Sequence, residues 1–418
     1  MTANNVGDFA EHCRKFRRSE IKLRDAVGFF ALVSNWSPVG IAESLSIVWT
    51  PNSAMVTPKR PRRLTDRMIP MIFASDNWAG AHPAISENLA AHVHGYVSAY
   101  GTSELDRKVE ERLSEIFERD VAVFFVGTGT AANALALAST NRAGGIAFCH
   151  REAHVNVDEC GAPEFFSHGA RLCPVDGARG KMDAARLEAE IRRFPPDVVH
   201  GGQPMAVTLT QATESGTVYS LAEIEAVASI AKSHKLPLHM DGARFANALV
   251  SLDTTPAEMT WKRGVDLLSF GGTKNGCWCA EALILFDPAK THEMHFLRKR
   301  AAQLFSKSRF IAAQFDAYLK GDLWLDLARH ANSMARRLAE GIAASAVSRL
   351  AWTPEANEVF VILKRDVAAR LEEQGAVFYD WPAPQDLAAS LAADEGLYRL
   401  VTSFATRADE VDQFIAAC

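Results

Sequence analysis

Short apolar runs that suit buried strands alternate along this chain with segments whose apolar residues fall at helical spacing. The predicted strands include residues 145–149, 171–175, 206–210, 237–241 and 265–270. Between two of them, Leu221, Ile224 and Val227 recur at the spacing of one helix face. This alternation predicts an α/β fold with a mostly parallel sheet covered by helices on both faces. Ligands bind such sheets at the carboxyl ends of the strands.

The pattern changes near residue 309, where longer helical segments replace the regular alternation. The predicted elements are a long helix at 329–342, a strand at 359–363, a short helix at 367–373, a strand at 397–404 and a last helix opened by Thr406-x-x-Asp409. We therefore expect a large domain over residues 71–305 and a small α+β domain over residues 306–418.

The first seventy residues differ in composition from the rest, with eleven Lys and Arg against six Asp and Glu. A short apolar stretch at 26–33 lies between two Arg-rich patches, but no clear cleavage site follows it, so a targeting role is the less favoured alternative. We expect residues 1–70 to be a basic extension, either disordered or produced by an upstream start-codon assignment.

The composition suits a globular enzyme. Of 418 residues 48% are hydrophobic and 23% charged, and a net charge of −5 argues against nucleic acid as a partner. No apolar run approaches the roughly 18 residues of a membrane span. Seven cysteines show no disulfide-like framework, and Cys277-x-Cys279 is too close for a usual zinc pair. We expect reduced thiols, no metal site and a cytoplasmic location.

Two charged residues follow predicted strands and carry the strongest chemical signal. Asp241 ends the strand at 237–241, and Lys274 follows the strand at 265–270 within Gly271-Gly272-Thr273-Lys274. A lysine after a strand is usually a solvated loop residue, and an Asp there often caps a helix. Together, however, they are what pyridoxal phosphate requires: an amine for a Schiff base and a carboxylate that keeps the pyridine nitrogen protonated.

The turn Gly127-Thr128-Gly129-Thr130 offers a place for the phosphate of that cofactor. A predicted strand at 120–126 precedes it and a helix follows it, so free N–H groups and hydroxyls meet at a helix N-terminus that favours an anion. A dinucleotide fingerprint would need a third glycine, and Ala132 stands in its place. Alone, the turn could equally be an ordinary capped helix start.

Several motifs in a fixed order give the chain a family resemblance from about residue 73 to its end. The motifs are Ser75-Asp76-Asn77, Tyr100-Gly101-Thr102, Gly127–Asn133, His154 with Asp158–Ala162, Gln211–Glu214, His239–Arg244, Thr273–Gly276 and Arg399–Phe404. The chain resembles the threonine aldolase group of fold-type I pyridoxal phosphate enzymes, within the β-eliminating lyases, and in particular the low-specificity L-threonine aldolases and phenylserine aldolases.

The resemblance implies roles for residues that bind charged groups. Arg244 resembles an arginine near the cofactor's O3′ and the substrate carboxylate. Arg399, with help from Ser75, resembles the residue that binds the substrate carboxylate as a fork. Without the resemblance, either arginine could be a solvated surface residue.

The resemblance also implies two histidines and two residues from a neighbouring subunit. His154 resembles a histidine that stacks on the cofactor ring and can exchange protons near the substrate hydroxyl, and His200 resembles a second one near that hydroxyl. Tyr100 and Arg309 resemble residues supplied across a dimer interface, Arg309 toward the phosphate. Taken alone, either histidine would be better read as an ordinary core or surface residue.

The function implied is cleavage of L-threonine, L-allo-threonine or a related 3-hydroxy amino acid such as phenylserine into glycine and an aldehyde, by a homodimer or homotetramer. Trp278 beside Lys274 departs from relatives and could reshape the aldehyde pocket. Two alternatives stay open: another enzyme of the same fold, such as a β-eliminating lyase or an aminotransferase, and a non-catalytic protein that keeps the fold.

Overall fold

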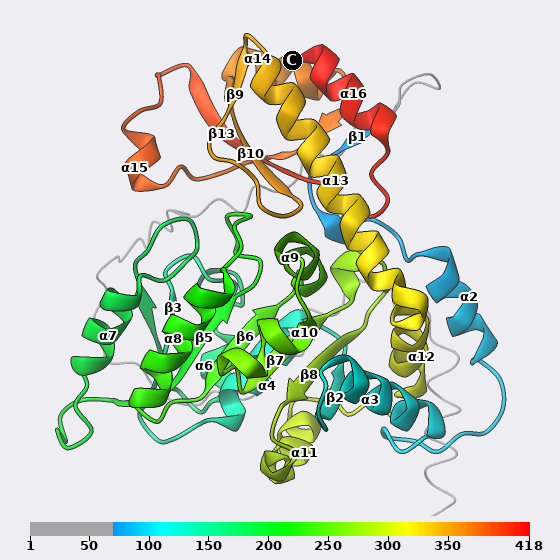
Figure 1. Ribbon diagram of the computed structural model, residues 1–418, viewed down its shortest axis with the longest axis vertical. Helices are drawn as coiled ribbons and strands as arrows, with labels where there is room; N and C mark the ends of the chain where they lie inside the picture. The colour runs from blue at the N-terminus through cyan, green and yellow to red at the C-terminus, as the bar shows by residue number, and fades with distance from the viewer. Residues whose placement is uncertain (1–69) are drawn as a thin grey trace, which may run out of the picture. The chain divides into compact units, whose positions relative to one another are not determined.

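The computed structural model describes residues 70–418, so the extension expected at residues 1–70 lies outside the described residues except for Pro70. Seven strands form a central sheet in the order β2-β8-β7-β6-β5-β3-β4 (Figure 1). They are β2 (Ala122–Val126), β3 (Gly145–His150), β4 (Arg171–Val175), β5 (Gln203–Thr210), β6 (Leu238–Gly242), β7 (Leu267–Gly271) and β8 (Glu281–Leu285). Only β8 runs against its neighbours, so the predicted mostly parallel sheet is confirmed.

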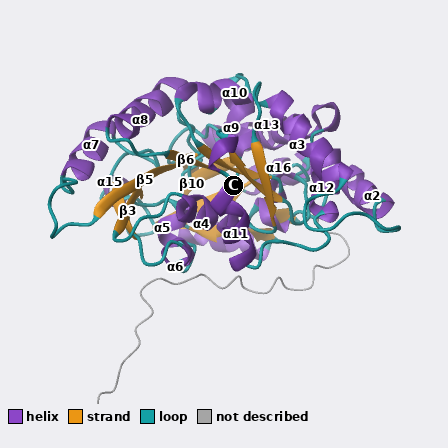
Figure 2. Ribbon diagram, turned by 90° about the horizontal axis from the view of Figure 1, so that it is seen from below, coloured by secondary structure: helices purple, strands orange, loops and turns teal. Residues whose placement is uncertain are grey.

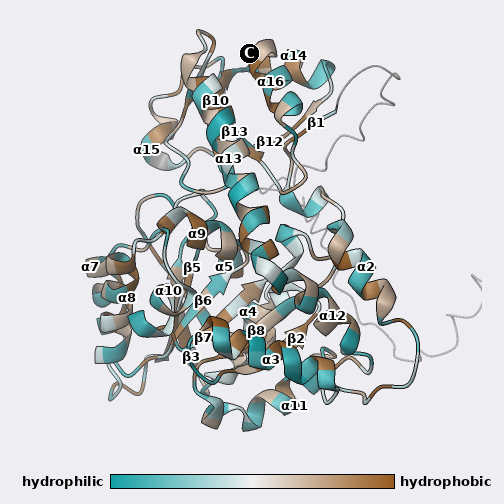
Figure 3. Cartoon of the chain, turned by 45° about the vertical axis from the view of Figure 1, so that its right-hand side comes forward, coloured by the Kyte–Doolittle hydropathy of each residue, from teal (hydrophilic) through white to brown (hydrophobic). Residues whose placement is uncertain are grey.

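Helices cover both faces of this sheet (Figure 2). One face carries α4 (Gly129–Ser139), α5 (His154–Val157), α6 (Ala162–Phe166) and α11 (His292–Arg300), and the other carries α7 (Ala184–Arg192), α8 (Leu221–Ser233) and α10 (Pro256–Met259). In α8, Ile224 and Val227 of the predicted stripe are buried, and Leu221 is half-buried. The outer helix α3 (Glu104–Ile116) is hydrophilic along much of its length (Figure 3) and buries only Asp106, Val109 and Leu113.

A second, antiparallel sheet has the order β12-β13-β10-β9. Its strands are β9 (Ser348–Leu350), β10 (Glu358–Lys364), β12 (Tyr379–Asp380) and β13 (Glu395–Val401); α14 (Arg365–Glu373), α15 (Gln385–Ala388) and α16 (Ala408–Ala417) complete this part. The 22-residue helix α13 (Leu323–Ala344) joins it to the central sheet's layers (Figure 1). Its buried stripe contacts α9 (Phe245–Leu252) near one end, and the helix also packs against β9, β10 and α16.

Two remaining helices, α2 (Pro83–Ala91) and α12 (Arg309–Tyr318), pack against each other, and α12 also contacts α3. At the start of the described chain, β1 (Met71–Ile72) pairs with β11 (Ala376–Val377), and Met71 and Phe73 lie in the apolar core of the C-terminal part. The boundary expected between residues 305 and 306 stays a prediction. Within residues 70–418 no helix combines the length and apolar character that a membrane crossing requires.

One predicted helix start is wrong in detail. The motif Thr406-x-x-Asp409 was expected to open the last helix, but α16 begins at Ala408 with Arg407 at its N-cap position. The Thr406 hydroxyl instead accepts the N–H of Ser403 at 2.8 Å, and Asp409 forms an ion pair with Arg407. The Thr406 hydroxyl and the Asp409 carboxylate, which a capping box would have used, are therefore bound to Ser403 and Arg407 instead.

Candidate active site

The carboxyl ends of the parallel strands bring the predicted cofactor residues to one edge of the central sheet. Asp241 pairs with Ser269 across β6 and β7, and Lys274 follows β7 in a short 3-10 helix, Thr273–Asn275. Strand β2 ends at Val126, directly before the Gly127 turn. The backbone at Gly271, the end of β7, lies close to the backbone of Ala243, just after β6. A Cβ on Gly271 would lie only 2.6 Å from the Ala243 carbonyl oxygen, so this approach requires glycine.

Asp241 is buried and both of its carboxylate oxygens have donors. The N–H of Ala243 donates to Oδ1 at 3.0 Å, and Nδ2 of Asn133 donates to Oδ2 at 2.8 Å. These bonds hold the carboxylate in one orientation at the end of β6. Its neighbour His239 is instead a satisfied core histidine, because burial lowers its pKa to about 4 and its ring nitrogens bond Thr208 and Ser269.

A chain of hydrogen bonds runs from Asp241 to His154. Asn133 uses the same Nδ2 to donate to Asp241 and, at 2.8 Å, to Oε1 of Glu159, and that oxygen lies 3.0 Å from Nδ1 of His154. The hydrogen bond with Glu159 is the main reason why the pKa of His154 is raised. The His154 side chain remains 38% exposed, so its ring is oriented by Glu159 and still accessible to a planar ligand.

Lys274 is half-buried and its amine has no hydrogen bond or ion pair within residues 70–418. Its positive charge nevertheless acts on the pKa values of Asp76, His154 and Glu281. The amine therefore lies near two carboxyl groups without forming an ion pair with either. An amine held at a tight turn in this way is free to react. Trp278, four residues later, is 65% exposed.

The Gly127 turn begins α4 as predicted. The Thr128 hydroxyl caps the helix by accepting the N–H of Ala131 at 3.1 Å, and the N–H of Gly127 donates to Gln303 at 3.0 Å. Gly129 and Thr130 are the first helical residues, so their N–H groups have no intrahelical acceptor. A Cβ on Gly129 would meet nothing within 4 Å, so no neighbouring atom crowds the first residue of this helix on that side.

Two arginines meet around Glu358, which is fully buried on β10. Arg244 makes two hydrogen bonds to Asp76, at 2.7 and 3.1 Å, and its Nη1 lies 3.4 Å from Glu358. Arg399 lies 3.6 Å from Glu358 and stacks 4.2 Å from the centre of the Trp381 ring. Burial alone would raise the pKa of Asp76, but the charges of Arg244 and Lys274 outweigh it and lower that pKa. Ser75, beside Asp76, accepts the N–H of Asn77.

The expected place of His200 near the substrate hydroxyl stays a prediction, because within this chain His200 lies far from Asp241. His200 is exposed in the loop before β5, whereas the carboxyl end of β5 is Thr210, the partner of Asp241. The seven residue steps from Gln203 to Thr210 span roughly 23 Å at about 3.3 Å per residue. His200 therefore lies at the opposite edge of the sheet from Asp241.

The segments that carry Tyr100 and Arg309 contact each other. Within this chain, the contacts of these two residues are with each other's segments and not with Asp241 or Lys274. Tyr100 is 50% exposed, and its N–H donates to the Ser306 carbonyl. Arg309 donates to the carbonyl of Gly95 at 3.1 Å. Their contribution to a neighbouring subunit stays a prediction.

Five buried carboxylates at this edge were not given a role from the sequence. Asp76, Glu159 and Glu214 stand inside the quoted motifs, so attention to every polar residue of those motifs would have found them. Glu281 and Glu358 stand in strands that look apolar, and only the structure shows that they lie near Lys274 and the two arginines.

Glu281 provides a test of this electrostatic arrangement. Burial raises its pKa to about 7 from an ordinary value near 4.5. A carboxyl group with a raised folded-state pKa is protonated in the native protein while it ionises in the unfolded chain, so stability falls as pH rises from about 4.5 to about 7. The apoprotein of Glu281→Gln should therefore be more stable than wild type by about 3 kcal/mol near pH 8 and similar near pH 4. Urea unfolding at both pH values measures this, and equal stability at the higher pH would contradict it.

The comparisons with known proteins agree with this geometry. Residues 73–366 match the β-eliminating lyase family. The chain belongs to that family. It is 43% identical over 307 residues to the low specificity L-threonine aldolase of Pseudomonas aeruginosa, covering 73% of this chain and 88% of that protein. A second such aldolase, from a Pseudomonas species, is 40% identical over 308 residues, with the same coverage.

Solved structures extend the likeness to three dimensions. The threonine aldolase of Leishmania major superimposes with a TM-score of 0.76 at 30% identity, over 82% of this chain and 97% of that one. A serine palmitoyltransferase of Sphingomonas wittichii matches with a TM-score of 0.62 at 15% identity over 86% of this chain and 92% of that chain, which shows a shared fold alone. The predicted fold-type I architecture is confirmed.

Proposed function

We propose that this member of the β-eliminating lyase family is a pyridoxal phosphate-dependent aldolase that cleaves L-threonine, L-allo-threonine or a related 3-hydroxy amino acid to glycine and an aldehyde. One observation carries the proposal. The amine of Lys274, which has no hydrogen-bond or ion-pair partner within residues 70–418, lies at the same sheet edge as the carboxylate of Asp241, which accepts two hydrogen bonds. Relatives named low specificity L-threonine aldolase support the same reaction.

The residues present fit the cofactor. Lys274 would hold it covalently, Asp241 would face its ring nitrogen, and the open N-terminus of α4 at Gly129 would receive its phosphate. When bound, pyridoxal phosphate takes up the electron pair that a broken bond leaves on the substrate's Cα. The ring of His154, oriented by Glu159, would lie against the cofactor.

Arg399 is the better placed arginine for the substrate carboxylate. Within the described residues its guanidinium makes no hydrogen bond, whereas two bonds to Asp76 engage that of Arg244. A planar fork with free donors binds a carboxylate through two parallel hydrogen bonds. Arg244 and Asp76 would then support Arg399 from behind Glu358.

Incubation of the purified protein with threonine, allo-threonine and phenylserine tests the reaction. We expect equal amounts of glycine and the matching aldehyde, without any added keto acid. Ammonia and a keto acid would indicate a β-eliminating lyase, and a requirement for a keto-acid acceptor would indicate an aminotransferase. A protein that turns over none of these substrates would be non-catalytic.

We also propose that active sites are completed across a subunit interface in a homodimer or homotetramer. Large apolar side chains are exposed in the segments around Tyr100 and Arg309, among them Tyr96, Val97 and Phe305. A Cβ on Gly127 would lie 3.1 Å from the Phe305 ring, so this apolar surface borders the phosphate turn. Burying it against a second copy would remove it from water.

Mixing two inactive variants tests the shared site. Lys274→Ala chains and Arg309→Ala chains should each be inactive alone, and random exchange should restore activity at about a quarter of the sites, because each mixed dimer then contains one complete site. Activity is assayed after exchange has been verified by mass spectrometry. No recovery, or a fully active monomer in sedimentation, would exclude the shared site.

We infer a reducing, cytoplasmic location. The six cysteines of residues 70–418 form no disulfide. Thiols persist in that state mainly where the compartment is reducing.

A further inference from the structure

Another buried carboxylate at the active edge, Glu214, has an unusual set of contacts. Its Oε1 accepts the backbone N–H of His154 at 2.8 Å and the hydroxyl of Thr210 at 3.0 Å. Its Oε2 is buried and has no hydrogen-bond partner within residues 70–418. One oxygen is thus held in place while the other is free to bind a proton.

The charges around Glu214 set how readily it takes that proton. Burial raises its pKa to about 7, and the negative charge of Asp241 adds to the effect. The other titratable groups that interact with it are His154, whose backbone it binds, Arg244, Cys149 and Tyr219. A carboxylate with a pKa near the working pH can both accept and return a proton.

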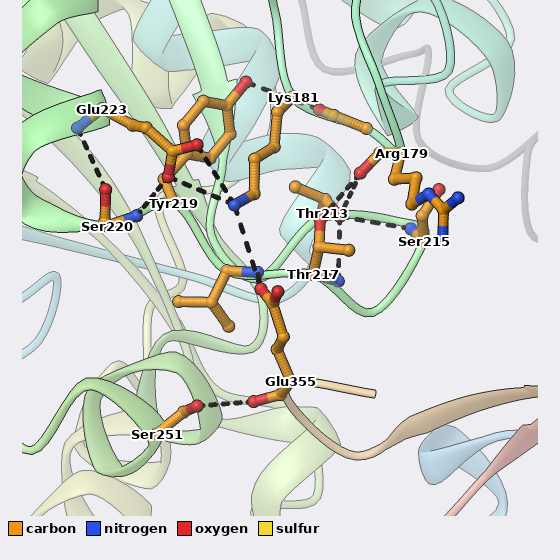
Figure 4. A network of polar contacts seen from close by, with 12 residues as sticks. Arg179, Lys181, Thr213, Ser215, Thr217, Tyr219, Ser220, Glu223, Ser251 and Glu355 are labelled. Carbon is orange, nitrogen blue, oxygen red and sulfur yellow. Dashed lines mark hydrogen bonds and ion pairs between the residues drawn. The ribbon is translucent and has the colours of Figure 1, made fainter. Parts of the chain in front are cut away.

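The loop that carries Glu214 is braced on both sides of it (Figure 4). The hydroxyls of Thr213 and Thr217 both donate to the Arg179 carbonyl, at 3.2 and 2.7 Å. From the C-terminal part, the carboxylate of Glu355 accepts a backbone N–H of the same loop at 2.6 Å. Such bracing holds a reactive group in one orientation, as proton transfer requires.

The other candidate proton acceptors at this edge are engaged elsewhere. His154 shares Nδ1 with Glu159, which raises its pKa and favours its charged form. Asp241 already accepts two hydrogen bonds, and Glu358 lies between two arginines. His200 is at the opposite edge of the sheet.

We propose that Glu214 is the catalytic residue that accepts the proton of the substrate's β-hydroxyl. The inference rests on the proposed aldolase function. As the hydroxyl proton moves to Oε2, the O–H electron pair becomes the second bond of the aldehyde C=O, and the Cα–Cβ bond breaks with its electron pair left on Cα. Cα then gains a proton, which yields glycine. Over the whole reaction one proton leaves the hydroxyl oxygen and one is added to Cα, so no net proton is gained or lost.

Glu214→Gln separates this role from a structural one, because the amide oxygen can still accept the bonds from His154 and Thr210. Two reactions of the holoenzyme are compared: cleavage of threonine, and exchange of the glycine Cα proton with deuterated water, which involves no hydroxyl. We expect kcat for cleavage to fall at least about a hundredfold while exchange stays close to the wild-type rate. The visible spectrum of the bound cofactor should not change.

Two further measurements complete the test. Wild-type kcat/KM should rise with pH as Glu214 ionises near pH 7, and Glu214→Gln should lose this limb. In the apoprotein, infrared difference spectra should show a protonated carboxyl signal that titrates near pH 7 and is weaker in Glu214→Gln. Glu355→Ala, which loosens the same loop while retaining Glu214, is the matched control and should lower cleavage and exchange together.

Glu214→Gln that cleaves threonine at the wild-type rate would overturn the inference, as would parallel loss of cleavage and exchange, the pattern expected of Glu355→Ala. If the wild-type enzyme exchanges the glycine proton but cleaves no 3-hydroxy amino acid, the proposed function itself fails and the role of Glu214 falls with it.

Discussion

Replacing Lys274 with alanine is expected to abolish aldol cleavage and the visible absorption band of lysine-bound pyridoxal phosphate. Lys274 is the lysine whose charge acts on both Asp76 and His154 at this edge. Because the covalent attachment of the cofactor depends on that amine, we expect kcat to fall by at least about a thousandfold. Absorption spectroscopy and an aldehyde assay on the same preparation measure both effects.

The surface lysine Lys290 provides the matched control, since it is 67% exposed and, within residues 70–418, pairs with Asp287 alone. Lys290→Ala should keep the absorption band and the rate. A Lys274→Ala protein that still yields a borohydride-reducible cofactor adduct would show that another lysine holds the cofactor.

Asp241→Ala is expected to fold and to lose most activity, by roughly a hundredfold or more, because the cofactor ring would no longer be held in its protonated, electron-accepting form. Folding should survive because Asn133 keeps its second partner, Glu159. Circular dichroism checks the fold, and cofactor titration shows whether binding persists.

Asp241→Asn is the companion variant, since it preserves shape and removes only the charge. Both variants should be impaired if the charge matters. Near-normal turnover by Asp241→Ala with bound cofactor would exclude the proposed role.

Much of the large sheet could be predicted from the sequence because buried parallel strands leave continuous apolar runs. The run at 171–175 coincides with β4, and the runs ending near Thr210 and Asp241 became β5 and β6. Strand direction then places Asp241 and Lys274 at the same edge. The same reasoning places His200, which precedes β5, at the opposite edge of the sheet within one chain.

Elements defined by distant partners could not be predicted in this way. Strand β8 is missing from the predicted set, although residues 282–286 form an apolar run; what that run does not show is its antiparallel pairing with β2 and β7. β1 is only two residues long and pairs with β11 about three hundred residues later. Such pairs form because the folded chain brings them together.

The sequence by itself determined most of the parallel strands and their order along the chain, the family resemblance, and the candidate lysine and aspartate of a cofactor site, since these follow from local periodicity, motifs and residue chemistry. Only the tertiary structure decided which carboxylates are buried beside them. Glu214, Glu281 and Glu358 look like ordinary acidic residues in the sequence, and it is their removal from water that changes their pKa values or holds them between cations. Desolvation depends on the packing of the whole fold, which no local pattern contains.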